Sequence, residues 1–255
     1  MFKLHTLKGK IIYTAKTDRG LRRNVNQDAI AAFTQEQLGL FVAADGMGGH
    51  SQGELASKAL ITEYQDYWEM LIEQPEIPEF DVIVEQIQEV LLKANRKIYE
   101  HYNQGQICGA TAVILLIMGE RYAIFSVGDS HIYSWVKRKY RLLTVDDIWD
   151  TQPSTVSNYT PEEIAANSKR GKLVQAVGTG PDINIHISMD RILKGQVFLL
   201  CSDGLYKFCE DSYLKRHLKR ILSEKSMQET LDLFMKRVFE NGAGDNVSVI
   251  LVKVL

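Results

Sequence analysis

The order of strand-like and helix-like segments is the feature that most constrains this chain. Short apolar runs bounded by Gly, Asn or Asp predict strands at 11–16, 29–33 and 38–44. Apolar residues then recur every three or four positions across 55–72 and 81–102. This spacing predicts two helices, which Pro75 and Pro78 separate. Strands are predicted again at 111–118, 121–127, 131–136 and 140–143.

The C-terminal half is less regular. Residues 145–176 are more polar, and Thr160 followed by Pro161 predicts a helix start. Strands are predicted at 183–189, 197–201 and 247–254. One or two helices precede the last strand, the second beginning near Ser226 in a capping-box pattern. Because helices do not alternate one-for-one with strands, we expect an α+β fold with mainly antiparallel sheets, in a single domain over 1–255.

Composition narrows the function classes. The chain has 255 residues and a formal net charge of −2, which argues against a general nucleic-acid binder. Its three cysteines, with no C-x-x-C spacing, are expected to be small buried side chains in a reducing compartment. The N-terminus has no apolar run of signal-peptide length, and no segment reaches membrane-spanning length. A cytoplasmic protein without a membrane partner is therefore expected.

Aspartates recur at the ends of the predicted strands. Asp45, Asp129 and Asp203 come directly after buried runs, Asp28 comes just before the second strand, and Asp245 comes just before the last. Asp-Gly and Gly-Asp are ordinary turn dipeptides, so any one of these positions alone is explained by a turn. Five such positions favour a shared site. Carboxylates that converge repel one another, and a bound divalent cation removes that penalty.

An oxygen-only ligand set favours Mg²⁺ or Mn²⁺ over zinc, and paired metals of this kind stabilise phosphoryl displacement. Arg23, upstream of Asp28, is a candidate donor to phosphoryl oxygens. The glycine-rich stretch 46–53 lacks the Lys-Ser/Thr ending of a P-loop. We interpret its glycines as letting the backbone approach a metal, with the Gly46 carbonyl as a candidate ligand.

Six motifs resemble, in order and spacing, the PP2C-type (PPM) phosphatases, and Met47 is typical of the bacterial branch. They are Arg23-x-x-Asn26-Gln27-Asp28, the stretch 42–50, Cys108-Gly109-Ala110-Thr111, Val127-Gly128-Asp129-Ser130, the stretch 200–205, and Gly244-Asp245-Asn246-Val247-Ser248-Val249. The resemblance covers the chain from Tyr13 to Val254.

This resemblance implies a four-layer α-β-β-α sandwich and metal-dependent hydrolysis of phosphoserine and phosphothreonine in proteins. It implies two core ions, Mn²⁺ or Mg²⁺, bridged by Asp45 and by a hydroxide that attacks phosphorus in line without a phosphoenzyme. Asp203 and Asp245 would complete the ligand set of one metal, and the Gly46 carbonyl would help to hold the other. Asp129, with Asp203, would hold a third ion. Asp28 would orient metal-bound water, and Arg23 would bind the substrate phosphate.

The sequence also departs from the family pattern. His131 replaces the usual Arg after Gly-Asp-Ser, and Asp147-Ile148-Trp149 stands where the family commonly has Asp-His-Ser. A flap beside the metals is expected over roughly 146–176, centred on 149–172, without the family's substrate contacts. His50 is one candidate for the acid that protonates the leaving group; the alternative is a loop histidine.

Three readings of the function remain open. The first is an active protein phosphatase, a monomer whose substrates are phosphorylated by a Ser/Thr kinase. The second is a weakly active or inactive member of the fold that binds a partner or senses a signal, and the third is a phosphatase of a small phosphate ester. Tyr64, Tyr67 and Trp68 could form a partner groove on their helix, but at helical spacing they are expected to be core.

Overall fold

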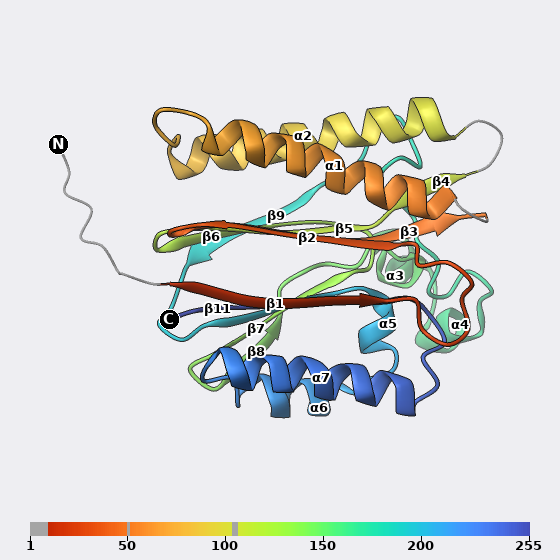
Figure 1. The fold of residues 1–255 in the computed structure, drawn as a ribbon. Coiled ribbons are helices and arrows are strands. Elements are labelled where there is room, and N and C mark those ends of the chain that lie inside the picture. Colours follow the sequence, from red (N-terminus) through yellow and green to blue (C-terminus); the bar gives the residue numbers. More distant parts are fainter. Residues whose placement is uncertain (1–9, 50–51, 104–106) are drawn as a thin grey trace.

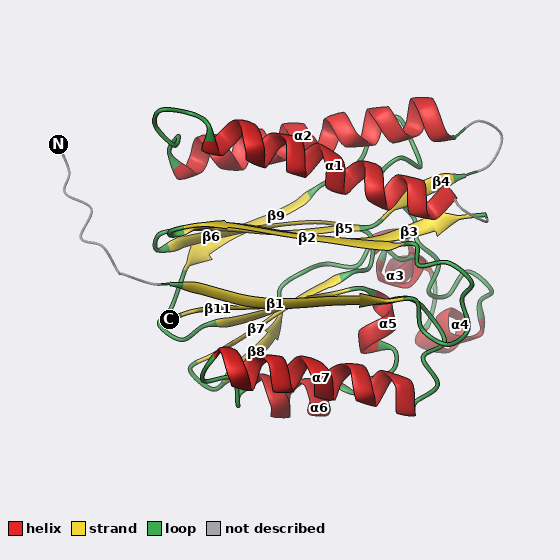
Figure 2. Cartoon of the chain, viewed as in Figure 1, coloured by secondary structure: helices red, strands yellow, loops and turns green. Residues whose placement is uncertain are grey.

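The computed structural model describes residues 10–49, 52–103 and 107–255 and shows four layers. Helices α1 (Gln52–Ile72) and α2 (Phe80–Tyr102) cover the outer face of one sheet. Helices α6 (Asp211–Leu218) and α7 (Glu224–Glu240) cover the outer face of the other, and the two sheets stack between the helix pairs (Figures 1 and 2). The expected α+β, four-layer sandwich is confirmed.

Both sheets contain only antiparallel pairings. In spatial order, the first sheet contains β1 (Ile11–Asp18), β11 (Val247–Val254), β10 (Val197–Cys201), β7 (His131–Val136) and β8 (Lys139–Leu142). The second contains β2 (Asp28–Gln35), β3 (Leu38–Gly48), β5 (Ala112–Met118), β6 (Arg121–Val127) and β9 (His186–Arg191). A short strand, β4 (Cys108–Ala110), pairs with the end of β3.

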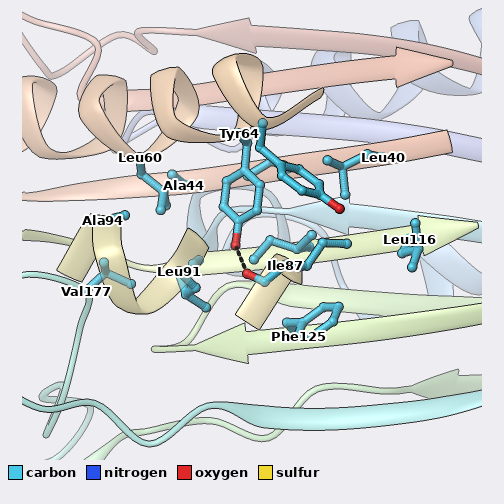
Figure 3. Close-up of a cluster of buried hydrophobic side chains, with 14 of the residues drawn as sticks. Leu40, Ala44, Leu60, Tyr64, Ile87, Leu91, Ala94, Leu116, Phe125 and Val177 are labelled. Atoms are coloured by element: carbon cyan, nitrogen blue, oxygen red, sulfur yellow. Dashed lines mark hydrogen bonds between the residues drawn. The ribbon is translucent and has the colours of Figure 1, made fainter. Parts of the chain in front are cut away.

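Three apolar clusters separate the four layers. One lies between α1–α2 and the second sheet, one between the two sheets, and one between the first sheet and α6–α7. The central strands β5 and β10 are apolar along their whole length because both of their faces are buried. Strand β11 is also buried throughout, and its apolar run is interrupted at Ser248 and Lys253. Figure 3 shows the first cluster around Tyr64, whose hydroxyl donates to the Ile87 carbonyl at 3.1 Å.

Several sequence-based expectations about side chains are confirmed. Tyr64, Tyr67 and Trp68 are core residues with exposed fractions of 6% or less, so they do not form a surface groove. All three cysteines are free and buried. Thr160 caps α4 (Pro161–Ala166) in a full capping box.

No helix among residues 10–49, 52–103 and 107–255 is long and apolar enough to cross a membrane.

Element boundaries differ from the predicted ones at several places. Helix α7 is capped by Ser223, and Ser226 is its third residue, because each of these serine hydroxyls accepts a hydrogen bond from the backbone N–H of the other. The strand predicted at 183–189 lies at 186–191. The strand predicted to end at residue 44 continues to Gly48, since 46–48 pair with β4. Helix α1 begins at Gln52, three residues before its predicted start.

Candidate active site

The predicted acidic residues come from both sheets and meet at one end of the sandwich. Asp28 and Asp45 are direct partners in the β2–β3 register, so their side chains emerge on the same face of neighbouring strands. Asp129 follows β6, Asp203 begins α5 (Asp203–Tyr206) just after β10, and Asp245 immediately precedes Asn246 and β11. Asp28 and Asp129 are buried, and the other three are half-buried.

The five carboxylates lie close enough to perturb one another. Burial raises the pKa of Asp45 well above its ordinary value, and the charges of the other four aspartates raise it further. Burial also raises the pKa of Asp28 to about 7, although hydrogen bonds from Ser202 and Ser248 oppose the shift. The pKa of Asp129 is raised to about 6 by burial and by the charge of Asp203. The structure therefore brings the five predicted aspartates together at one place.

Two cations contact this acidic cluster. An Nη of Arg23 donates to Oδ2 of Asp245 at 2.8 Å, and half of the Arg23 side chain is exposed. The ammonium of Lys207 donates to Oδ2 of Asp203 from one helical turn further along the chain. Arg23 is one of the residues predicted from the sequence, whereas Lys207 lies outside the motifs. The four-residue spacing between Asp203 and Lys207, typical of helical ion pairs, is the signal that could have found it.

Uncharged hydrogen bonds fix the aspartates to the strands. The Thr111 hydroxyl accepts from the Asp45 backbone N–H at 3.0 Å and pairs with the Ser130 hydroxyl at 2.7 Å. The Ser202 hydroxyl donates to Oδ2 of Asp28 at 2.7 Å and accepts from the backbone N–H of Ser248 at 3.0 Å. These contacts tie the two sheets together at the site.

The side chain of Asn246 connects the loop between β1 and β2 to the start of β11. Its Oδ1 accepts from the backbone N–H of Gln27 at 2.9 Å, and its Nδ2 donates to the carbonyls of Arg19 and Val25. The loop that carries Arg23 is thereby attached to the start of β11. Thr111, Ser202 and Asn246, three polar residues of the motifs, thus hold the acidic residues and their loops in place.

Two glycines permit very close backbone contacts. A Cβ at Gly46 would lie 2.0 Å from the Gly53 carbonyl oxygen and 2.5 Å from that of Gln27. A Cβ at Gly204 would lie 1.8 Å from the Asn246 carbonyl oxygen. The close approach that we expected at Gly46 is therefore between segments of the chain, and its carbonyl as a metal ligand stays a prediction.

The donor set fits a hard divalent cation. Within residues 10–49, 52–103 and 107–255, no three His, Cys, Asp or Glu side chains form a group able to hold a metal ion by themselves. Mg²⁺ and related ions, however, bind through one or two carboxylates and retain several waters. Oδ1 of Asp28 and Oδ1 of Asp203 are buried acceptors with no hydrogen-bond partner in the described structure. Crowded, repelling carboxylates with unused oxygens are what a divalent cation stabilises.

The region predicted as a flap contains η1 (Trp149–Thr151), α3 (Pro153–Asn158) and α4. Its two ends are joined, because the Trp149 N–H donates to the Lys172 carbonyl at 2.8 Å and 148 bridges to 173. Asp147 anchors it near the site: its carboxylate accepts from the Gly128 N–H at 2.9 Å and pairs with His186 at 2.8 Å.

His131, which stands where the family commonly has Arg, also contacts the base of the predicted flap. Its ring hydrogen-bonds to Asp146 at 2.9 Å and to the Tyr133 hydroxyl at 2.7 Å, and it stacks on Tyr206 with ring centroids 3.9 Å apart. Tyr206 in turn donates to the Asp129 carbonyl at 3.0 Å. His50, the candidate acid, lies outside the described residues.

Comparisons with known proteins agree with this geometry. A sequence model described as protein phosphatase 2C matches residues 20–251. The serine/threonine phosphatase stp of Listeria monocytogenes is 26% identical over 243 residues, covering 93% of this chain and 94% of the relative.

Among solved structures, the serine/threonine phosphatase Stp1 of Staphylococcus aureus superimposes with a TM-score of 0.83 at 26% identity, covering 100% of this chain and 99% of that one. The catalytic domain of the phosphatase PstP, solved in complex with two manganese ions, has a TM-score of 0.76 at 26% identity, with 96% and 98% coverage. The chain therefore belongs to the protein phosphatase 2C family.

Proposed function

We propose that this protein is a metal-dependent phosphatase that hydrolyses phosphoserine and phosphothreonine in proteins phosphorylated by a Ser/Thr kinase. The convergence of five aspartates with Arg23 at one end of the sandwich is the observation that carries the proposal. The family supports a phosphatase activity, and relatives named as serine/threonine phosphatases support the substrate class.

Asp45, Asp203, Asp245 and the Gly46 carbonyl are the proposed ligands of two core ions, Mn²⁺ or Mg²⁺, and Asp129 with Asp203 is the proposed site of a third. The two manganese ions in PstP support this assignment. When bound, such ions polarise phosphoryl oxygens and lower the pKa of water.

The chain's own residues would bind and orient the reactants. Arg23 uses one Nη on Asp245 and is half exposed, so its other N–H groups can donate to the oxygens of a substrate phosphate. Asp28 uses Oδ2 to accept from Ser202, which leaves Oδ1 to accept a hydrogen bond from the attacking water. Residues 146–176 are proposed as a flap within one phosphatase domain over 1–255.

The decisive experiment is hydrolysis of a phosphothreonine peptide with Mn²⁺ and with EDTA. Asp203→Asn should abolish turnover, whereas Asp232→Asn should not, because Asp232 lies on α7 and hydrogen-bonds to Gln228. Mn²⁺ binding is measured in parallel by calorimetry. Metal binding without turnover of the peptide would reject the proposal in favour of a binding or sensing role. Turnover only of p-nitrophenyl phosphate would favour a small ester as substrate.

A monomeric state, a cytoplasmic location and the lack of nucleic-acid or membrane partners stay predictions from the sequence.

A further inference from the structure

A cavity of about 240 Å³ lies between the free edges of the two sheets. Strand β8 is the last strand of one sheet and β9 the last of the other, and both contribute to its walls. The cavity is remote from the acidic cluster. Val136, in its wall, is seven residues beyond Asp129 along an extended segment, a separation of roughly 20 Å.

The walls of this cavity are strongly basic. Four cationic residues line it, Lys137, Lys139, Arg141 and Arg191, against the single acidic residue Asp190. None of the four forms an ion pair with any residue in the described part of the chain. The chain as a whole carries a formal net charge of −2, so this is a local concentration of uncompensated positive charge.

The strand register shows why two of these cations face the cavity. Arg141 is opposite Ser134 and Lys139 is opposite Val136 in the β7–β8 pairing, and all four line the cavity. Tyr140, between the two cations, packs instead into the core beneath α6 and α7. Because strand side chains alternate between faces, Lys139 and Arg141 project toward the second sheet. In the neighbouring strands, that face supplies the apolar core between the sheets.

Charges on edge strands also protect sheets from edge-to-edge pairing. Protection of the sheet edge would account for the charged side chains, but it does not account for the buried polar groups beside them. Gln196 donates to the Ser134 hydroxyl at 3.0 Å and accepts from the Leu193 N–H at 3.0 Å, and both side chains are buried. Tyr122, also buried, lies within the electrostatic reach of Arg141 from the opposite sheet. The cavity thus has polar hydrogen-bonding groups at its floor and cations around it.

The hairpin that closes one side has an unfavourable backbone. Lys137 and Arg138 both adopt positive φ, at 47° and 66°. Two-residue turns of this type favour Asn-Gly, because side chains with a Cβ are disfavoured in the left-handed region. Strained residues of this kind persist where another role requires them.

We propose that this cavity binds a small anion with at least two negative charges, a phosphate ester or a polycarboxylate. The volume suits a small molecule. Its four cations supply the charge, and the hydroxyl and amide groups of Ser134, Tyr122 and Gln196 supply hydrogen bonds. The site is distinct from the acidic cluster, so the proposal does not depend on the phosphatase assignment.

The test is a titration of the metal-free 255-residue chain with inorganic phosphate and, separately, with citrate, followed by ¹H–¹⁵N NMR at constant ionic strength. Saturable shifts at residues 134–141 and 190–196 are expected for at least one probe. The double variant Arg141→Gln/Arg191→Gln should bind at least tenfold more weakly. The matched variant Lys215→Gln/Lys219→Gln, which removes two exposed charges near the end of α6, should bind as the wild type does.

The tighter-binding probe identifies the ligand class. Should the double variant give a poorly dispersed spectrum, the single variant Lys139→Gln replaces it with the same criterion. Shifts that do not saturate, that occur only around the acidic cluster, or that are equal in the cavity and control variants would overturn the proposal.

Discussion

Lys207 is expected to weaken metal binding, so its removal should tighten it. The ammonium contacts Asp203, a proposed ligand. Partial burial lowers the pKa of Lys207, but the hydrogen bond to Asp203 and the charges of Asp203, Asp129 and Asp45 outweigh it and raise the pKa overall. The lysine is therefore a built-in counter-ion at the acidic cluster. An incoming divalent cation must displace this contact or bind beside a positive charge. Lys207→Met removes the competitor and keeps much of the apolar stem.

The magnitude follows from Coulomb's law. The Lys207 side chain is 51% exposed, so a dielectric close to that of water applies. A single charge about 5 Å from a divalent ion then costs roughly 1.7 kcal/mol. Partial screening and rearrangement of the flexible side chain reduce this to about 1 kcal/mol, equivalent to an approximately fivefold change in Kd.

Calorimetric titration with Mn²⁺ measures this effect without relying on turnover. Lys207→Met should bind Mn²⁺ several-fold more tightly than the wild type, whereas Lys207→Arg, which keeps the charge, should not. In an Asp203→Asn background the gain from Lys207→Met should shrink, because the two residues act on each other. Unchanged or weaker Mn²⁺ binding by Lys207→Met would refute the reasoning.

Three further predictions concern the scaffold of the site. Thr111→Val leaves the Asp45 N–H without its acceptor and should cost about 1–3 kcal/mol of unfolding free energy in urea titrations. Gly204→Ala forces a Cβ into the Asn246 carbonyl and should lower stability by more than about 2 kcal/mol, measured in the same way. The metal-free protein should lose stability as pH rises from about 4 to 7. Asp28 has its pKa raised from 3.8 to about 7 on folding, so the folded state holds the extra proton in this window.

Each of these predictions has its own control. Gly180→Ala should be tolerated, since the nearest atom to its added Cβ is 3.6 Å away. The pH dependence should be shallower in Asp28→Asn, which cannot titrate, and saturating Mn²⁺ should reverse it, since metal stabilises the ionised carboxylates. If the stability of the metal-free protein rises equally steeply with pH in the wild type and in Asp28→Asn, the raised pKa of Asp28 is contradicted. Thr111→Ser, which keeps the hydroxyl, should retain most of the stability that Thr111→Val loses.

The sequence predicted strands that form compact apolar runs, and it missed features that depend on a partner strand. Residues 121–127, 131–136, 197–201 and 247–254 form strands with the predicted limits, because each is a compact apolar run bounded by polar or turn residues. The Asp45-Gly46 dipeptide looks like a turn locally. It continues as strand because β4, more than 60 residues later, supplies its pairing.

Local signals also compete with one another in α7. Two serines three residues apart, Ser223 and Ser226, each fit the start of a helix. In the structure Ser223 is the cap: its hydroxyl accepts from the Ser226 N–H at 3.3 Å, and the Ser226 hydroxyl accepts from the Ser223 N–H at 2.9 Å. The role of His131 was beyond the sequence for a similar reason. Its partners Asp146 and Tyr206 are far apart in the chain and meet only in the folded protein.

The acidic cluster was predictable from the sequence because five carboxylates at the ends of strands would destabilise the folded protein if they came together without a cation. Like charges on directly opposed strand residues are destabilising, yet Asp28 and Asp45 form such a pair at the end of a well-packed sheet. The surroundings relieve this only in part. The Ser202 hydroxyl donates to one oxygen of Asp28, and Arg23 and Lys207 pair with Asp245 and Asp203. A fold that is otherwise locally consistent and keeps such a conflict at one place is expected to use it. A divalent cation bound between these carboxylates would replace their repulsion with attraction, which is why this conflict, more than any single motif, indicates the proposed active site.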